Sequence, residues 1–416
     1  MIRFLRQYFL IFISLSIINL LALPINAQQR TFNEILKQVL SETHSSFSNF
    51  SLELRKIDYK LPILEKLELR PNTDRLTFTR QQFTLRASFN SLAQREAMYN
   101  KQEAFISVQD ENTKKLNREK VFNTYQRYIH MARCHSEMAL LEKESNLLQK
   151  QLNISEQVLS SGQSVDLSDY LQLRTELMAS KTSLEEKVIE YKNFRSLLGI
   201  DTSIQLPSIS IEAEGMAAFV SEQKLDTSNI FDANSKKAQL AYLEASSKAE
   251  KAEASRMLDF VQARYTVRED LLLENRFSIG FGFMFPYKGS SKLELADILT
   301  RQKITHKDIS EIIGTTTEEY SIKKNAFERK YLLYKQLGEF SKDEKYIKLK
   351  TKIMESGRLN PLKFHEIFME ELSLEKKYSE TWFDMLELYL ELLHLTGRMY
   401  EEPYKNYLEA GAPKII

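Results

Sequence analysis

Two very long stretches of the sequence combine heptad-like apolar spacing with many Glu, Lys and Gln residues between the apolar positions. They run from about Ser91 to Leu159 and from about Ser291 to Met354. This pattern predicts uninterrupted α-helices. At 1.5 Å rise per residue, about 65 residues make a rod of roughly 100 Å, which excludes an ordinary globule. With only 11 Gly and 8 Pro in 416 residues, the composition fits long helices with few turns.

Each long helical stretch ends at a Ser-Gly pair, and the helical pattern restarts directly after it. The pairs open the segments "SGQSVDLSDYLQL" and "SGRLNPLKFHEIF", so that Gly357 follows Gly162 by 195 positions. Glycine suits the left-handed residue just past a helix end. Asn360 before Pro361 is a strong start for the next helix. The sequence therefore predicts two antiparallel helical hairpins with equivalent tips.

Two further landmarks recur at nearly the same offset. The helix endings "FRSLLGI" and "LLHLTGR" place Gly397 198 positions after Gly199, and the alternating stretches "QQFTLRASFN" and "RFSIGFGFMFPY" lie about 194 positions apart. Three landmarks in the same order predict a duplicated half. The expected division is a signal sequence at 1–27, a first repeat at 28–200, an equatorial linker at 201–229, a second repeat at 230–397 and a tail at 398–416.

Each half is expected to open with a short helix and a strand pair. The short helices are placed at about Phe32 to Leu54 and Ile230 to Leu258, and the strand pairs at about Ile57 to Phe89 and Asp259 to Phe285. The return helices after the tips are only about half as long as the outgoing ones. We predict that the short helix of the other half supplies the missing length, the second short helix extending the first return helix and the first extending the second.

The second strand pair has the alternation of a sheet with one side in lipid. The large residues Phe277, Ile279, Phe281, Phe283 and Phe285 alternate with Ser278, Gly280, Gly282 and Met284, and in the partner strand Val261, Ala263, Tyr265 and Val267 alternate with polar residues. An apolar outer face and a polar inner face are typical of strands in a transmembrane barrel. The alternative is that the apolar face covers the core of a soluble sheet.

The first strand pair is less regular. Phe83, Leu85, Ala87 and Phe89 alternate correctly, but the upstream residues Leu76 and Phe78 have the opposite parity, so we expect a bulge or an external loop around Pro71 to Asp74. Four strands cannot close a membrane barrel, because the smallest have about eight. A barrel would therefore need several copies of the chain.

The first residues read as a secretory signal. Arg3 and Arg6 precede an apolar run, and Ala27 ends a small-residue cleavage site, so the mature chain is expected to begin at Gln28. The alternative is a retained membrane anchor. No cysteine follows that could carry an N-terminal lipid, and the single cysteine, Cys134, is expected to be a buried apolar residue.

Nothing in the sequence indicates nucleic-acid binding or catalysis. The net charge of +1 becomes −1 once the two signal arginines are removed, which gives no reason to expect nucleic acid. The "GFGF" stretch lacks the third glycine of a dinucleotide fingerprint. His130 and His135 lie on different helix faces. We expect no catalytic site, no cofactor and no metal.

Together these features resemble the TolC-like outer-membrane efflux protein family. The best match is the stretch from Ser161 to Ile200, with its Gly tip and Leu-Leu-Gly helix end, and the repeat pattern covers nearly all of the mature chain. The resemblance implies a mainly α fold with a small β part: long helical hairpins forming an α-barrel in the periplasm, and four strands per chain contributing to a twelve-stranded barrel of a homotrimer in the outer membrane. It also implies a periplasmic adaptor protein and an inner-membrane pump as partners.

By position, the tips would contact the adaptor and the residues just inside them would form the gate. The tip residues are Gly162, Gln163, Ser164, Gly357, Arg358 and Leu359, and the candidate gate residues are Asp166, Asp169, Lys363 and His365. Gln163 and Arg358 stand where the family commonly has a hydrophobic residue. The alternatives are plain turn and cap roles for the tips and a solvated surface role for the charged residues.

The sequence therefore predicts a passive exit duct of a tripartite efflux or type I secretion system, which exports small molecules or polypeptides. The alternative is a periplasmic coiled-coil adaptor or scaffold without a channel, since hairpins of this length suit partner binding equally well.

Overall fold

The computed structural model describes residues 32–57, 60–73, 81–160, 167–200, 209–267, 276–283, 289–341, 343, 346–348, 351–352, 361–411 and 415. The expected signal sequence at 1–27 and the expected first mature residue, Gln28, lie outside these residues. None of the described helices combines the length and the apolar character that a bilayer crossing requires.

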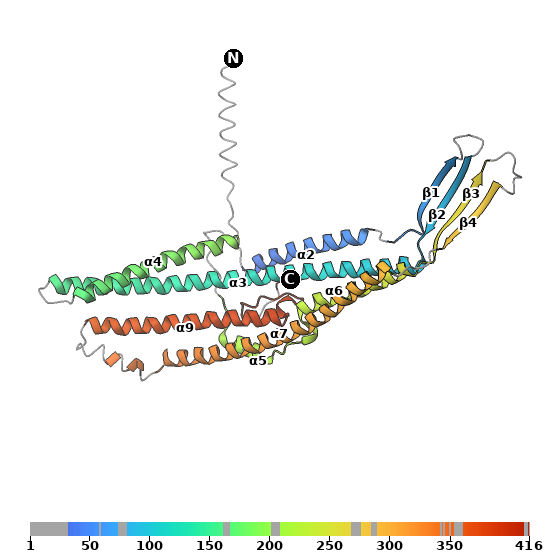
Figure 1. The fold of residues 1–416 in the computed structure, drawn as a ribbon. Coiled ribbons are helices and arrows are strands. Elements are labelled where there is room, and N and C mark those ends of the chain that lie inside the picture. Colours follow the sequence, from blue (N-terminus) through green and yellow to red (C-terminus); the bar gives the residue numbers. More distant parts are fainter. Residues whose placement is uncertain are drawn as a thin grey trace, which may run out of the picture. The chain divides into compact units, whose positions relative to one another are not determined.

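The chain passes twice through the order short helix, strand pair, long helix and return helix (Figure 1). The elements are α2 (Phe32–Lys56), β1 (Leu64–Thr73), β2 (Gln81–Phe89), α3 (Leu92–Ser160), α4 (Leu167–Leu197), α5 (Ala213–Glu222), η2 (Thr227–Asn229), α6 (Phe231–Ala254), β3 (Leu258–Thr266), β4 (Phe277–Phe283), α7 (Gly289–Ser341), α9 (Pro361–Leu395) and η4 (Arg398–Tyr400). The short helices α5 and η2 stand between the two passes.

The first long helix is confirmed, and the second is shorter than predicted. Helix α3 has 69 residues, whereas α7 has 53 and ends at Ser341 instead of near Met354. The backbone N–H of Asp343 donates to the carbonyl of Phe340 at 3.2 Å, and the N–H of Ile347 donates to the carbonyl of Asp343 at 3.0 Å. Ser and Asp side chains compete with the helical backbone for hydrogen bonds, so the helix stops here and a new turn begins at Asp343.

The two predicted helix ends at Gly199 and Gly397 are confirmed. Both glycines are left-handed, with φ of 65° and 74°. The N–H of Gly199 donates to the carbonyl of Ser196, and that of Ile200 donates to the carbonyl of Arg195. A left-handed glycine with such backward bonds pairs the carbonyls that a helix end would otherwise leave unpaired.

The chain forms two compact units, which are described separately. The first consists of residues up to 36 with 127–210 and 359–373. In it α4 packs on the second part of α3. Leu148 and Leu152 of α3 form one apolar cluster with Leu173 and Leu177 of α4. The two leucines of each helix are four residues apart and so lie on one helix face. The Ser145 and Ser180 hydroxyls lie 2.9 Å apart where the helices meet.

The second unit consists of 37–126, 211–358 and 374–416, and in it α6 lies between α3 and α7. Lys115 of α3 pairs with Asp232 of α6 at 2.9 Å, and Lys236 of α6 pairs with Asp308 of α7 at 2.9 Å. Small buried residues of α6, among them Ala233, leave room for close packing on both sides.

The C-terminal half of α9 occupies the same layer between α3 and α7. Its His394 packs on Phe122 of α3 with ring centroids 4.3 Å apart, and its Glu391 pairs with Lys323 of α7 at 2.9 Å. Helix α6 thus follows α9 along α7 (Figure 1). The prediction that α6 extends the first return helix, α4, is therefore wrong.

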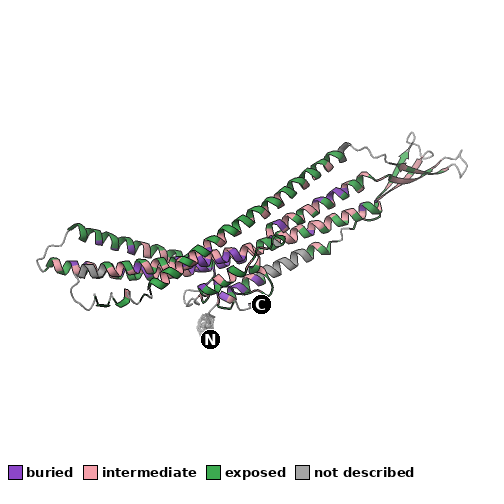
Figure 2. Cartoon of the chain, turned by 90° about the horizontal axis from the view of Figure 1, so that it is seen from below, coloured by how far each residue is buried: buried purple, intermediate pink, exposed green. Residues whose placement is uncertain are grey.

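The core of the second unit surrounds the C-terminal segment. Tyr125 of α3 is fully buried; its hydroxyl donates to the carbonyl of Lys405 at 3.0 Å and accepts from the backbone N–H of Tyr407 at 3.4 Å. Apolar side chains of α9 and of the residues after it complete this core, namely Leu386, Leu390, Leu393, Met399 and Leu408. Along the long helices buried positions alternate with exposed ones (Figure 2), as expected for helices packed on one side.

A half-buried histidine in this unit is expected to make its stability depend on pH. The His394 ring and the Tyr400 hydroxyl are hydrogen-bonded. Burial lowers the pKa of His394 below its usual value; the nearby Asp232 and Glu319 act against this shift and Arg118 acts with it. The unfolded chain then binds a proton near pH 6.5 while the folded chain does not, so stability is full above that pH and is lost as the pH falls below it.

We expect the midpoint of thermal unfolding to decrease between about pH 6.5 and 5. The variant His394→Gln should lose most of this slope, because it removes the half-buried titrating ring. The matched control is His306→Gln on α7, whose ring is exposed and should not matter. An unchanged slope in His394→Gln would refute the assignment.

Candidate functional site: a sheet with an apolar and a polar face

The four strands form one antiparallel sheet in the order β1-β2-β3-β4 (Figure 1). Opposite residues of neighbouring antiparallel strands lie on the same face, and one row across all four strands is Leu69, Leu85, Ala263 and Ile279. The alternation along each strand completes this face. Its members are Leu67, Leu69, Phe83, Leu85, Ala87, Val261, Ala263, Tyr265, Phe277, Ile279, Phe281 and Phe283.

This apolar face is largely exposed in the single chain. The exposed fraction of its large side chains runs from 36% for Phe83 to 65% for Leu69. Contiguous apolar surface of this kind marks contact with lipid or with another protein. Phe285, the last residue predicted for this face, lies outside the described residues.

The opposite face is polar. It carries Lys66, Glu68, Arg70, Asn72, Gln82, Thr84, Arg86, Ser88, Gln262, Arg264, Thr266 and Ser278, together with Phe260, Gly280 and Gly282. The Gln82 amide donates to the Thr266 hydroxyl at 3.4 Å. The guanidinium of Arg86 lies over the ring of Phe260, 3.4 Å from its centroid, which places the one aromatic side chain of this face beneath a charge.

The glycines of β4 leave space for the side chains of β3, including the Phe260 ring. A Cβ atom on Gly282 would overlap the Phe260 ring, and one on Gly280 would lie 3.0 Å from the Gln262 amide nitrogen. The small residues seen in the sequence thus fit the side chains of β3. The sequence pattern did not reveal Phe260, because the apolar alternation of β3 starts at Val261 and Phe260 lies on the opposite, polar face.

Two bulges and a partly buried arginine, Arg256, lie where the sheet meets the helices. The pairing shifts between Leu64 and Lys66 and between Leu258 and Phe260, so Glu65 and Asp259 stand at the irregular positions. The Arg256 side chain, 11% exposed, pairs with Glu65 at 2.7 Å and lies 3.8 Å from Asp259. Asp259 also accepts from Arg86 at 3.0 Å.

The first strand pair has a bulge, but not around Pro71, and the external loop expected as the alternative extends into residues that the structure does not describe. Strand β1 pairs regularly from Lys66 to Thr73, with Pro71 opposite Phe83, and the bulge is at its beginning, before Lys66. After the bulge, the charged residues Lys66, Glu68 and Arg70 fall on the polar face, because Leu67 and Leu69 alternate with them. Leu76, Phe78 and Asp74 lie outside the described residues.

The tip and gate residues are mostly outside the described residues. This holds for Gly162, Gln163, Ser164, Asp166, Gly357, Arg358 and Leu359. Asp169 is exposed in the first turn of α4. Lys363 and His365 lie in the first turns of α9, where only the backbone is described. Their roles as adaptor contacts and gate therefore stay predictions.

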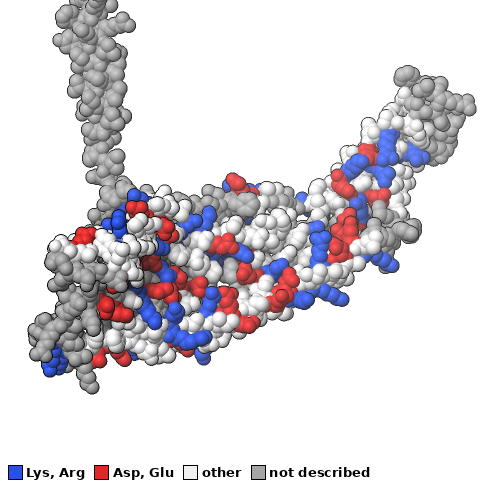
Figure 3. Space-filling view, turned by 60° about the vertical axis from the view of Figure 1, so that its left-hand side comes forward, with Lys and Arg blue, Asp and Glu red and all other residues white. Residues whose placement is uncertain are grey.

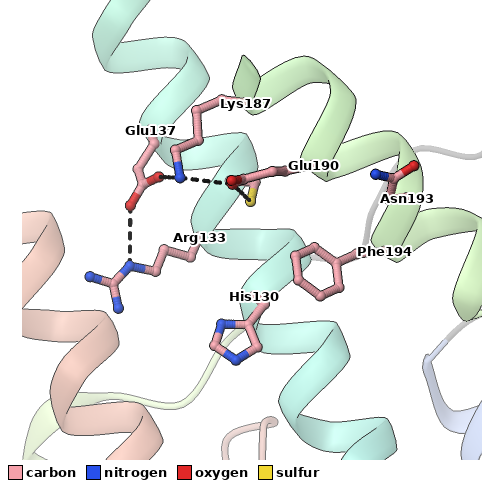
Figure 4. Close-up of a pocket in the computed structure, with 8 residues that line it drawn as sticks. His130, Arg133, Glu137, Lys187, Glu190, Asn193 and Phe194 are labelled. Atoms are coloured by element: carbon pink, nitrogen blue, oxygen red, sulfur yellow. Dashed lines mark hydrogen bonds and ion pairs between the residues drawn. The ribbon is translucent and has the colours of Figure 1, made fainter. Parts of the chain in front are cut away.

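A separate pocket of about 440 Å³ lies between α3 and α4 in the first unit (Figure 4). It is lined by His130, Arg133, Cys134, Glu137, Lys187, Glu190, Asn193 and Phe194. Glu137 pairs with Arg133 and Lys187, both at 3.1 Å, and Glu190 pairs with Lys187 at 2.8 Å.

The thiol in this pocket lacks the lowered pKa that is typical of a reactive cysteine. Cys134 is buried, as predicted, and its Sγ lies 3.6 Å from Glu190. Burial raises the pKa of Cys134 to about 11, so the thiol stays protonated at neutral pH. Within the described residues no cluster of three His, Cys, Asp or Glu side chains could hold a metal ion.

Comparison with known proteins identifies the fold. The sequence matches no known family profile and no curated protein. Among solved structures, the outer-membrane channel OprN matches with a TM-score of 0.64 and 14% identity, over 88% of this chain and 89% of that one. The outer-membrane channel CmeC of Campylobacter jejuni matches at 0.62 and 11% identity, over 90% and 85%. The outer-membrane protein VceC of Vibrio cholerae matches at 0.59 and 12%, over 89% and 94%. The chain therefore has the fold of the TolC-like outer-membrane channels, which confirms for the fold the resemblance drawn from the sequence.

Proposed function

We propose that this protein is a channel of the outer membrane that continues into the periplasm. The observation that carries the proposal is the two-faced sheet. Its apolar face suits the lipid side of a barrel wall and its polar face suits a water-filled lumen. The similarity in fold to outer-membrane channels such as OprN and CmeC supports the same reading.

The sheet needs further copies of the chain to close. Strands β1 and β4 each have one edge without a partner among the described strands, and an open edge is not tolerated in lipid. Pairing β4 of one copy with β1 of the next would satisfy both. Three copies give twelve strands, an even number within the range of membrane barrels. We therefore propose a homotrimer.

The channel would act as a passive duct. An inner-membrane pump would supply the energy, and a periplasmic adaptor would contact the tips around Gly162 and Gly357. The charged residues Asp166, Asp169, Lys363 and His365 would gate the entrance. Adaptor binding would open it by favouring a conformation in which the hairpins are less tightly wound. The exported substrates would be small molecules or polypeptides of an efflux or type I secretion system.

Conductance in a planar lipid bilayer tests this function. The purified protein should give ion-conducting steps, and Asp166→Asn with Asp169→Asn should raise the conductance if these carboxylates narrow the entrance. A mock preparation from cells without the protein is the control. A correctly assembled protein that conducts no ions, even with both substitutions, would contradict the proposed function.

A further inference from the structure

The polar face of the sheet carries an excess of positive charge. The side chains that alternate onto this face include Lys66, Arg70, Arg86 and Arg264, against the single carboxylate of Glu68. The excess is local, because basic and acidic side chains are interspersed over the helices (Figure 3) and the whole chain is nearly neutral.

The nearby acids do not remove this excess. Glu68 is shared between Lys66 and Arg70, both of which it contacts. Asp259 neutralises Arg86 at 3.0 Å, and Glu65 is paired with Arg256. These two acids stand at the bulges, at the end of the sheet that leads into the helices.

Among the described residues of the polar face, the end of the sheet toward Thr73 and Gln81 therefore has only basic residues as its charged ones. Arg70, Thr84, Arg264 and Ser278 face one another in one row across the four strands. Arg264 is exposed and has no acidic partner among the described residues. In the next row toward that end, the members on β1, β2 and β3 are the uncharged Asn72, Gln82 and Thr266.

We propose that this row makes the barrel selective for anions. The inference rests on the proposed function, in which the polar face lines the lumen and three copies repeat the row around it. A wall with an apolar outer face has a low dielectric constant, which concentrates the field of its charges in the lumen. Rings of Arg or Lys side chains favour anions in pores. Chloride and anionic organic solutes then pass more readily than cations of the same size.

The reversal potential in a KCl gradient measures this selectivity. The wild-type channel should be more permeable to Cl⁻ than to K⁺, and Arg70→Gln with Arg264→Gln should lower the permeability ratio by about twofold or more. The matched control is Arg301→Gln, because Arg301 is an exposed arginine of α7 that pairs with Asp297 on its own helix. This control should keep the wild-type ratio.

A second variant tests the same row of residues in case the double arginine variant does not assemble. If the double variant does not assemble, Ser278→Glu places a negative charge in the same row and should lower the ratio likewise. A conducting channel that prefers K⁺, or whose ratio neither variant changes, would overturn anion selectivity while leaving the channel function intact. A wild-type protein without conductance would overturn the channel function and this inference with it.

Discussion

Replacing Ile279 with arginine is expected to prevent stable insertion of the protein into the outer membrane. Ile279 lies in the middle row of the apolar face, opposite Ala263, and its side chain is 63% exposed. An arginine on the lipid face near the bilayer midplane costs about 2–4 kcal/mol. In a trimer the same substitution occurs three times, so the total cost approaches the whole stability of a typical domain.

The matched control for this substitution is the neighbouring residue. Ser278→Arg introduces the same side chain one position earlier in β4, where the alternation points it to the polar face. Heat-modifiable trimer in the outer-membrane fraction, measured by gel mobility, should be lost in Ile279→Arg and retained in Ser278→Arg. Equal behaviour of the two variants, or the opposite order, would refute the assignment of the faces.

Truncation of Tyr125 is expected to give the largest loss of stability in the helical part. Its side chain is 1% exposed and holds the C-terminal segment through Lys405 and Tyr407. Tyr125→Ala removes a fully buried aromatic ring, and such changes cost about 3–5 kcal/mol. Burial also raises the pKa of Tyr125, so its hydroxyl stays a donor throughout the neutral range.

Two variants of Tyr125 separate the contribution of its ring to stability from the contribution of its hydroxyl. Tyr125→Phe keeps the ring and leaves the Lys405 carbonyl without its donor, at a cost of about 1–3 kcal/mol. Leu332→Ala on α7 is the control, since Leu332 is 59% exposed. Denaturant midpoints should fall in the order Leu332→Ala, Tyr125→Phe, Tyr125→Ala. A Tyr125→Ala variant as stable as the control would show that the C-terminal segment is not held here.

Local patterns allowed much of the fold to be predicted from the sequence. Heptad-like spacing identified α3 almost to the residue, and Gly199 and Gly397 end their helices as expected. The alternation of Phe277, Ile279 and Phe281 predicted the apolar face, because side chains in a strand alternate strictly. These features depend only on residues close together in the chain.

Features that depend on distant residues were missed. The position of α6 beside α7 rests on pairs such as Lys236 with Asp308, 72 residues apart. No periodicity within α6 distinguishes that partner from α4. At the bulge, Glu65 pairs with Arg256, again far along the chain. The charge balance of the polar face likewise became visible only once the strand register was known.

The most direct test of the central claim is extraction of the outer-membrane fraction with detergent, followed by mass measurement of the purified particle. The proposed channel predicts that the protein is found in that fraction, needs detergent to leave it and has the mass of three chains. A monomer or dimer recovered from the soluble periplasm without detergent would contradict the channel and favour a coiled-coil adaptor or scaffold.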